Sequence, residues 1–251
     1  MAEILLYAEV TQENYVHTVI FELANKAQEL AKKLDNAQVS ALLICKQGLA
    51  DLYKEAFINS GFDKVYIAED NRFTHYSTEL YSKVAIDVIK EIKPEIILIG
   101  ATSQGRDLAP RVSSSLHTGL TADCTALDVN EKGQLMATRP TFGGKLMATI
   151  LSKTLPQMAT VRPKVFKPSS ENVVKNTQFL NVNVAIDDIK RKVEFVEFVK
   201  RAKCEINDID SAKIIVAGGK GMKNQAGFEL LKILAQKLGA TVGASRGAVD
   251  M

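Results

Sequence analysis

The chain has 251 residues, of which 46% are hydrophobic, a proportion typical of a folded protein with one large or two ordinary domains. Its 32 basic and 29 acidic residues are well mixed, so the net charge of +3 creates no basic field of the kind that binds nucleic acid. No apolar run approaches the roughly 20 residues that span a bilayer, and Glu3 interrupts any signal-peptide pattern. We therefore expect a cytoplasmic protein that neither binds nucleic acid nor inserts into a membrane.

Strand and helix patterns alternate along the first hundred residues. Short apolar runs predict strands at 4–8, 39–44, 64–67 and 95–99. Amphipathic stripes predict helices at 15–34, 49–59 and 78–92. Repeated βα units of this length predict an α/β fold, a doubly wound, mostly parallel sheet that is Rossmann-like, with helices on both faces.

A hydroxyl-rich turn follows the fourth predicted strand and leads into a helix that should end near Leu116. Ligands bind at the carboxyl ends of parallel strands, so Thr102, Ser103 and Arg106 are candidates for contact with an anion. A helix N-cap at Thr102 or Ser103 explains the same hydroxyl groups without a ligand. We favour the N-cap interpretation.

The alternation of strand and helix breaks in the middle of the chain. Residues 134–153 predict two antiparallel strands that turn at Gly143 and Gly144, so the sheet should have an antiparallel edge. Further strands are predicted in PQMATVRP and, at the sheet edge, at 182–184 and 194–199. The acidic segment CEINDIDS predicts a linker near Ile206, which would separate a domain of residues 1–206 from a second domain at 207–251.

The last forty residues follow the order strand, glycine turn, helix. The run 214–216 predicts a buried parallel strand, and the apolar stripe from Phe228 predicts a helix that ends at Gly239. Between them, the glycines of AGGKG would let the backbone approach a phosphate, and the N–H groups of the next helix favour an anion. The spacing is not the dinucleotide fingerprint, and a tight turn without a ligand fits the glycines equally well.

The order of these blocks resembles one known family. AGGKG and then KNQAGFELLKILAQKLGATVGASRGAVD resemble the start of the flavin-binding domain of the electron transfer flavoprotein α subunit, with GASR before AVD as the most specific part. Upstream, G-A-T, G-R-D-L-A-P-R and L-T-A-D-C-T occur in the order of that family, so the resemblance covers nearly the whole chain. The hairpin and PQMATVRP most resemble the electron-bifurcating versions.

The resemblance implies an N-terminal α/β domain and the first βα unit of a second, flavin-binding domain. That second domain would be incomplete, because the family continues past AVD with further flavin-binding loops, and we expect the sequence to be part of a longer chain. The implied cofactor is FAD, and the implied partner is the electron transfer flavoprotein β subunit. The implied activity is electron transfer from flavin dehydrogenases, such as the acyl-CoA dehydrogenases of fatty acid beta-oxidation, or from NADH.

The resemblance also assigns cofactor-binding residues, which are Lys220, Gly221, Ser245 and Arg246. Arg246 matches the arginine that lies against the flavin ring in the family. Lys220 stands where the family usually has arginine, so it keeps the charge but loses the planar guanidinium group.

Residues for bond-making chemistry are not grouped in the sequence. None of the histidines has a ligand or base partner at a suitable spacing, and the cysteines form no C-x-x-C pair; these residues are His17, His75, His117, Cys45, Cys124 and Cys204. An electron carrier needs no such group, because its cofactor performs the chemistry. The alternative is a non-catalytic nucleotide-binding or scaffold domain that pairs with another chain, whereas the broken glycine fingerprint disfavours an NAD-dependent dehydrogenase.

Overall fold

The computed structural model describes residues 2–58, 60–169, 175–199, 209 and 212–250. It divides into two compact parts, which we call the N-terminal unit, Met1–Phe195, and the C-terminal unit, Val196–Met251. The predicted linker near Ile206 and the predicted domain boundary after it lie outside the described residues.

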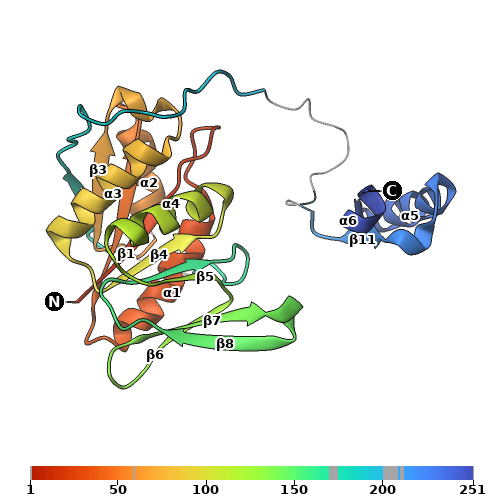
Figure 1. The fold of residues 1–251 in the computed structure, drawn as a ribbon, viewed down its shortest axis with the longest axis horizontal. Helices are drawn as coiled ribbons and strands as arrows, with labels where there is room; N and C mark the ends of the chain where they lie inside the picture. Colours follow the sequence, from red (N-terminus) through yellow and green to blue (C-terminus); the bar gives the residue numbers. More distant parts are fainter. Residues whose placement is uncertain (1, 59, 170–174, 200–208, 210–211, 251) are drawn as a thin grey trace. The chain divides into compact units, whose positions relative to one another are not determined.

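The N-terminal unit is built on a seven-stranded sheet with the strand order β10-β3-β2-β1-β4-β9-β5 (Figure 1). All neighbouring strands in this sheet pair in parallel. The strands are β1 (Glu3–Ala8), β2 (Gln38–Cys45), β3 (Lys64–Glu69), β4 (Ile96–Gly100), β5 (Leu120–Cys124), β9 (Gln157–Val161) and β10 (Gln178–Asn181). The predicted α/β fold with a doubly wound sheet is confirmed.

Helices cover both faces of the sheet because successive side chains of a strand point to opposite sides. Ile4 and Leu6 pack in the cluster that contains α1 and α2, whereas Leu5 and Tyr7 pack in the cluster that contains α3 and α4. The helices are α1 (Val19–Lys32), α2 (Ala50–Ile58), α3 (Thr78–Ile92) and α4 (Ser103–Ser115). In the described ranges of the chain, no helix is both long and apolar enough to cross a membrane.

The first helix begins later than the sequence predicts. Residues 15–18 are not helical, because Val16 forms an isolated antiparallel bridge with Val10 and His17 N–H donates to the carbonyl of Glu9 at 2.8 Å. The loop after β1 is therefore folded back on itself before α1 starts.

The antiparallel strands form a separate three-stranded sheet with the order β6-β7-β8, which contains β6 (Ala126–Val129), β7 (Leu135–Thr141) and β8 (Leu146–Leu151). The predicted turn is confirmed, since Gly143 and Gly144 have φ angles of 67° and 86°, which glycine adopts readily. Leu127 and Leu135 are buried in the cluster that contains α1. The hairpin of β7 and β8 projects from the rest of its unit (Figure 1).

Two of the predicted edge strands are wrong. The observed edge strand, β10, ends at Asn181. Val182 N–H still donates to the carbonyl of Ile67 at 2.9 Å, but residues 182–184 are not a strand, and residues 194–199 form no strand. Val196 illustrates the reason, because it is 88% exposed. An alternating pattern becomes a strand only where a neighbour supplies hydrogen bonds and a surface to pack against. The strand in PQMATVRP is correct and is the internal strand β9.

The C-terminal unit contains a two-stranded parallel sheet with β11 (Ile215–Gly218) and β12 (Thr241–Ala244). Its helices are α5 (Gln225–Leu238) and the short α6 (Arg246–Val249). Gly239 adopts φ 61° after α5, so the predicted C-cap is confirmed.

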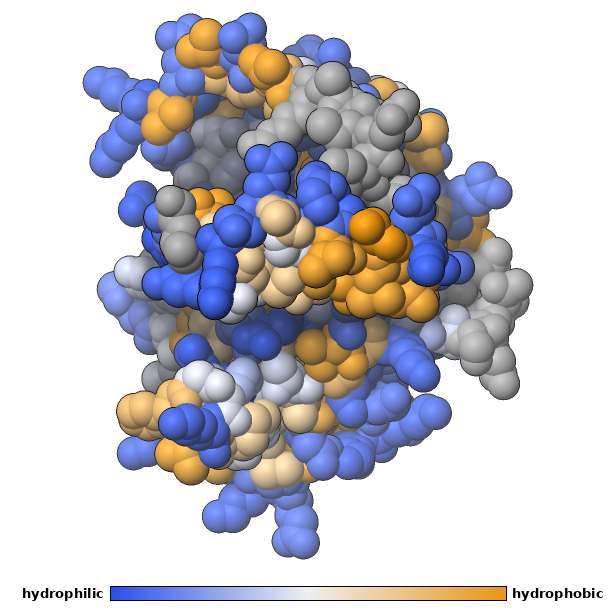
Figure 2. Space-filling view, turned by 90° about the vertical axis from the view of Figure 1, so that its right-hand side faces the viewer, coloured by the Kyte–Doolittle hydropathy of each residue, from blue (hydrophilic) through white to orange (hydrophobic). Residues whose placement is uncertain are grey.

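The predicted burial of the strand at 214–216 is wrong, because Ile215 is 46% exposed. Helix α5 packs over the other side of the sheet, where a Cβ added to Gly218 would lie only 2.5 Å from the Cδ1 atom of Leu231. Helix α5 also carries exposed leucine and isoleucine side chains, which are Leu230, Ile233, Leu234 and Leu238. Figure 2 shows hydrophobic patches among the hydrophilic residues of the face that it draws.

Candidate functional site

The C-terminal unit brings two turns together at the carboxyl ends of its strands. Because β11 and β12 are parallel and in register, Gly218 pairs with Ala244, and both strands end at the same edge. The Ser245 N–H donates to the carbonyl oxygen of Gly218 at 2.9 Å, which holds the two turns side by side. Such an edge is the usual ligand-binding position of a parallel sheet.

The predicted cofactor residues lie on these two turns. Lys220 and Gly221 belong to the short 3-10 helix η4, Lys220–Met222, after β11, and Ser245 precedes Arg246 at the start of α6. A Cβ added to Gly247 would lie 2.9 Å from Cε of Lys220, so the lysine side chain runs from the first turn alongside Gly247 in the second. The structure therefore joins residues that are about 25 positions apart in the sequence.

Arg246 differs from the other predicted residues in its exposure. Its side chain is 93% exposed, and its Nε atom lies 3.4 Å from Oδ2 of Asp250 one turn later. The ion pair is weak because water screens both groups. The guanidinium group is therefore free to turn toward a neighbouring molecule.

A cavity of about 330 Å³ opens beside the glycine turn. Its lining contains two lysines and no carboxylate, and the lining residues are Gly219, Lys220, Lys223, Asn224, Gln225, Phe228 and Ala248. A Cβ added to Gly221 would meet nothing within 4 Å, so the space next to the turn is open. An open turn flanked by cations fits the phosphate-bearing part of a dinucleotide.

The sequence interpretation missed Lys223 as a lining residue. Its backbone has φ 64°, a value that is uncommon for a residue with a side chain. Asn224 is an N-cap, since its Oδ1 atom accepts from Gly227 N–H at 3.2 Å. Asparagine is a favoured N-cap residue, so Asn224 in the sequence already indicated where α5 starts.

The hydroxyl-rich turn of the N-terminal unit has a structural explanation. The Thr102 hydroxyl accepts from Gly105 N–H at 2.9 Å, so the preferred N-cap interpretation is confirmed. Arg106 is paired with Asp123 at 3.1 Å, and Asp123 also pairs with Arg162 at 2.5 Å. Hydrogen bonding to Arg162 lowers the pKa of Asp123, so this carboxylate stays charged and keeps both arginines engaged.

Groups for bond-making chemistry are not assembled in the part of the chain that the structure describes. No group of three or more His, Cys, Asp and Glu residues there is arranged to hold a metal ion. His17 accepts from Val19 N–H at 3.2 Å, and Ser113 donates to the carbonyl of Pro110 at 3.1 Å, so both have structural roles. Cys45 and Cys124 are buried free thiols, and Cys204 lies outside the described residues.

The two buried cysteines should be chemically inert. Burial raises the pKa of Cys45 to about 12 and that of Cys124 to about 11, so almost no thiolate is present at pH 8. In a Cys204→Ser variant, we expect Ellman's reagent at pH 8 to detect no rapidly reacting thiol until denaturant is added, when two should react. A rapid reaction of one thiol in the folded variant would contradict this assignment.

Comparison with known proteins identifies the family of the chain. Residues 4–187 match the electron transfer flavoprotein domain, and residues 208–251 match the electron transfer flavoprotein FAD-binding domain. The protein FixB of Clostridium saccharobutylicum is 44% identical over 244 residues, which cover 95% of this chain and 70% of that protein.

Other relatives carry the name electron transfer flavoprotein subunit alpha. The protein from Clostridium acetobutylicum is 43% identical over 245 residues, 95% of this chain and 71% of the relative. The protein from Thermoanaerobacterium thermosaccharolyticum is 41% identical over 249 residues, 99% of this chain and 74% of the relative. This chain therefore belongs to the electron transfer flavoprotein α-subunit family, whose cofactor is FAD.

Proposed function

We propose that this subunit transfers electrons through FAD between flavin dehydrogenases, such as acyl-CoA dehydrogenases, or NADH and a downstream acceptor. The observation that supports the proposal most is the juxtaposition of the glycine turn and the Ser245–Arg246 turn at one edge of the β11–β12 sheet. The sequence-based alternative of a nucleotide-binding or scaffold domain is not favoured, since both parts of the chain match electron transfer flavoprotein families. The cytoplasmic location and the domain boundary stay predictions.

We assign different tasks to the cofactor-binding residues. Lys220 would oppose the negative charge of the FAD phosphates, and the bare backbone of Gly221 would allow their close approach. The Ser245 hydroxyl would supply a hydrogen bond, and Arg246 would place a permanent cation with a flat face beside the flavin. Bound FAD supplies the reversible uptake of electrons, and the residues set its position and electrostatic environment.

The family pairs with a β subunit, and we propose that the hairpin of β7 and β8, which we call the β7–β8 arm, contacts that subunit. Large apolar side chains are exposed along its turn and second strand, namely Phe142 (80%), Leu146 (59%), Met147 (58%), Ile150 (41%) and Leu151 (47%). An exposed apolar group of this size marks an interaction surface. Strand β8 is also the outer strand of its sheet, with backbone groups open to another chain.

The flavin absorption spectrum of the protein co-purified with its β subunit tests the electron-transfer proposal. We expect a bound flavin that is reduced either by NADH or by an acyl-CoA dehydrogenase supplied with its substrate, and the active donor identifies the subgroup. A heterodimer without flavin, or with a flavin that neither donor reduces, would contradict the proposal.

A further inference from the structure

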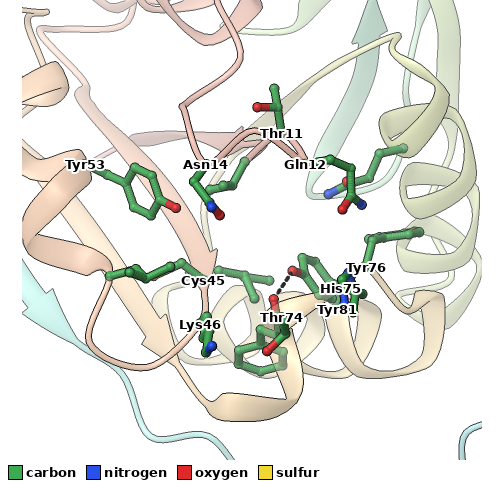
Figure 3. Close-up of a pocket in the computed structure, with 15 residues that line it drawn as sticks. Thr11, Gln12, Asn14, Cys45, Lys46, Tyr53, Thr74, His75, Tyr76 and Tyr81 are labelled. Atoms are coloured by element: carbon green, nitrogen blue, oxygen red, sulfur yellow. Dashed lines mark hydrogen bonds between the residues drawn. The ribbon is translucent and has the colours of Figure 1, made fainter. Parts of the chain in front are cut away.

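A second cavity lies in the N-terminal unit, at the carboxyl ends of β1, β2 and β3 (Figure 3). Its volume is about 330 Å³, within the range of small-molecule sites. Its lining comes from the loop after β1, the end of β2, α2, the segment after β3, and the starts of α3 and α4. This edge is where doubly wound sheets bind ligands, and the FAD site described above belongs to the other unit.

Two polar atoms of this cavity lack partners. Tyr53 is only 2% exposed, and among the described residues its hydroxyl oxygen has no hydrogen-bond partner. The same holds for Nδ1 of His75, whose ring is stacked on Phe195 with 3.6 Å between ring centroids. In Figure 3, the Tyr53 hydroxyl points into the open centre of the cavity. A buried polar group without a hydrogen-bond partner destabilises the fold, so its presence points to a group that enters this space.

The other phenol groups of the lining are already engaged. The Tyr81 hydroxyl donates to the carbonyl of Phe73 at 3.2 Å, and the Tyr76 hydroxyl donates to Asp107 at 2.6 Å. Among the aromatic residues of the lining, Tyr53 and His75 are therefore the ones with a buried polar atom that has no partner in the described part of the chain. The aromatic rings of the lining add flat apolar surfaces on which a planar ligand can pack.

The charge of the lining limits the kind of ligand. Among the lining residues, Lys46 is the charged one, and no carboxylate is present. Cys45 does not add negative charge, because its burial keeps it a neutral thiol. Gln12 and Asn14 face the cavity from the loop after β1 and supply neutral polar groups (Figure 3).

We propose that this cavity binds a small planar heteroaromatic anion. The ring lies among the aromatic side chains and forms hydrogen bonds with Tyr53 Oη and His75 Nδ1, while a carboxylate or phosphate group meets Lys46. A carboxylate and a phosphate would both pair with Lys46, so one ligand that carries a carboxylate and one that carries a phosphate are tested separately.

Isothermal titration calorimetry of the full chain with pyridine-3-carboxylate and with adenosine monophosphate tests the proposal. We expect saturable binding of at least one of these anions and weaker binding of uncharged adenosine. Tyr53→Phe should lower the affinity for the anion that binds by about fivefold, which corresponds to the loss of one hydrogen bond. Lys46→Gln should lower the affinity for the same anion. Lys90 is an exposed lysine outside the cavity, so Lys90→Gln should leave that affinity unchanged.

The melting temperature of the unliganded variant separates binding from a structural role. Because the Tyr53 hydroxyl has no partner among the described residues, Tyr53→Phe should leave the melting temperature unchanged or slightly raised. A clear fall would show that the hydroxyl stabilises the fold and would overturn the proposal. Failure of both anions to bind at millimolar concentration, or equal binding by the wild-type chain and Tyr53→Phe, would also overturn it.

Discussion

The variant Met147→Glu should bind the β subunit about 100-fold more weakly than the wild-type chain does. Met147 is 58% exposed on the second strand of the β7–β8 arm, so the substitution changes little in the isolated subunit. In the complex, the new carboxylate would lose its water without gaining a cationic partner, which costs several kcal/mol. About 2.8 kcal/mol corresponds to the 100-fold change.

The matched control is Leu52→Glu. Leu52 is 63% exposed on α2 and also belongs to the N-terminal unit, but it lies outside the β7–β8 arm. Surface plasmon resonance with immobilised β subunit gives both affinities. If Met147→Glu binds as tightly as Leu52→Glu, the arm is not part of the interface.

The elements that the sequence predicts well are those with strong local signals. Helix α3 is predicted with its observed bounds, because its apolar stripe is regular and Lys93, with φ 50°, ends it just before Pro94. By contrast, β5 and β6 were missed. Residues 120–124 alternate apolar and polar side chains over only five positions, and residues 126–129 do not alternate, so both signals are weak. These segments become strands through pairing with β9 and β7.

The two candidate sites differ in how visible they are in the sequence. The two turns proposed to bind FAD lie just after two strands, so their meeting at one edge follows from a parallel sheet. The part played by Gly247 could not be predicted, since it depends on where the Lys220 side chain runs. The cavity beside Tyr53 is harder still to predict from the sequence, because six separate segments line it and no spacing rule connects them. An unpaired hydroxyl is visible only after packing is known.

Arg246→Ala should lower the reduction potential of the FAD in the complete heterodimer. A fixed cation stabilises the reduced flavin when that form carries negative charge, so removing the cation makes reduction less favourable. We expect a change of about 60 mV, which is a tenfold change in a one-electron equilibrium. Arg246→Lys should lower the potential by less, since it keeps the charge but loses the flat face.

The ion pair between Arg246 and Asp250 supplies a variant with the opposite sign. Asp250→Asn removes the carboxylate that lies 3.4 Å from the guanidinium group, so the field of Arg246 is no longer partly cancelled and the potential should rise slightly. Lys237→Ala, which removes a cation from the last turn of α5, should change neither the potential nor its dependence on salt. Spectroelectrochemical titration measures all four variants. Equal potentials in Arg246→Ala and the wild-type protein would remove Arg246 from the flavin site, whereas a fall in Arg246→Ala with a rise in Asp250→Asn would assign the effect to the charge.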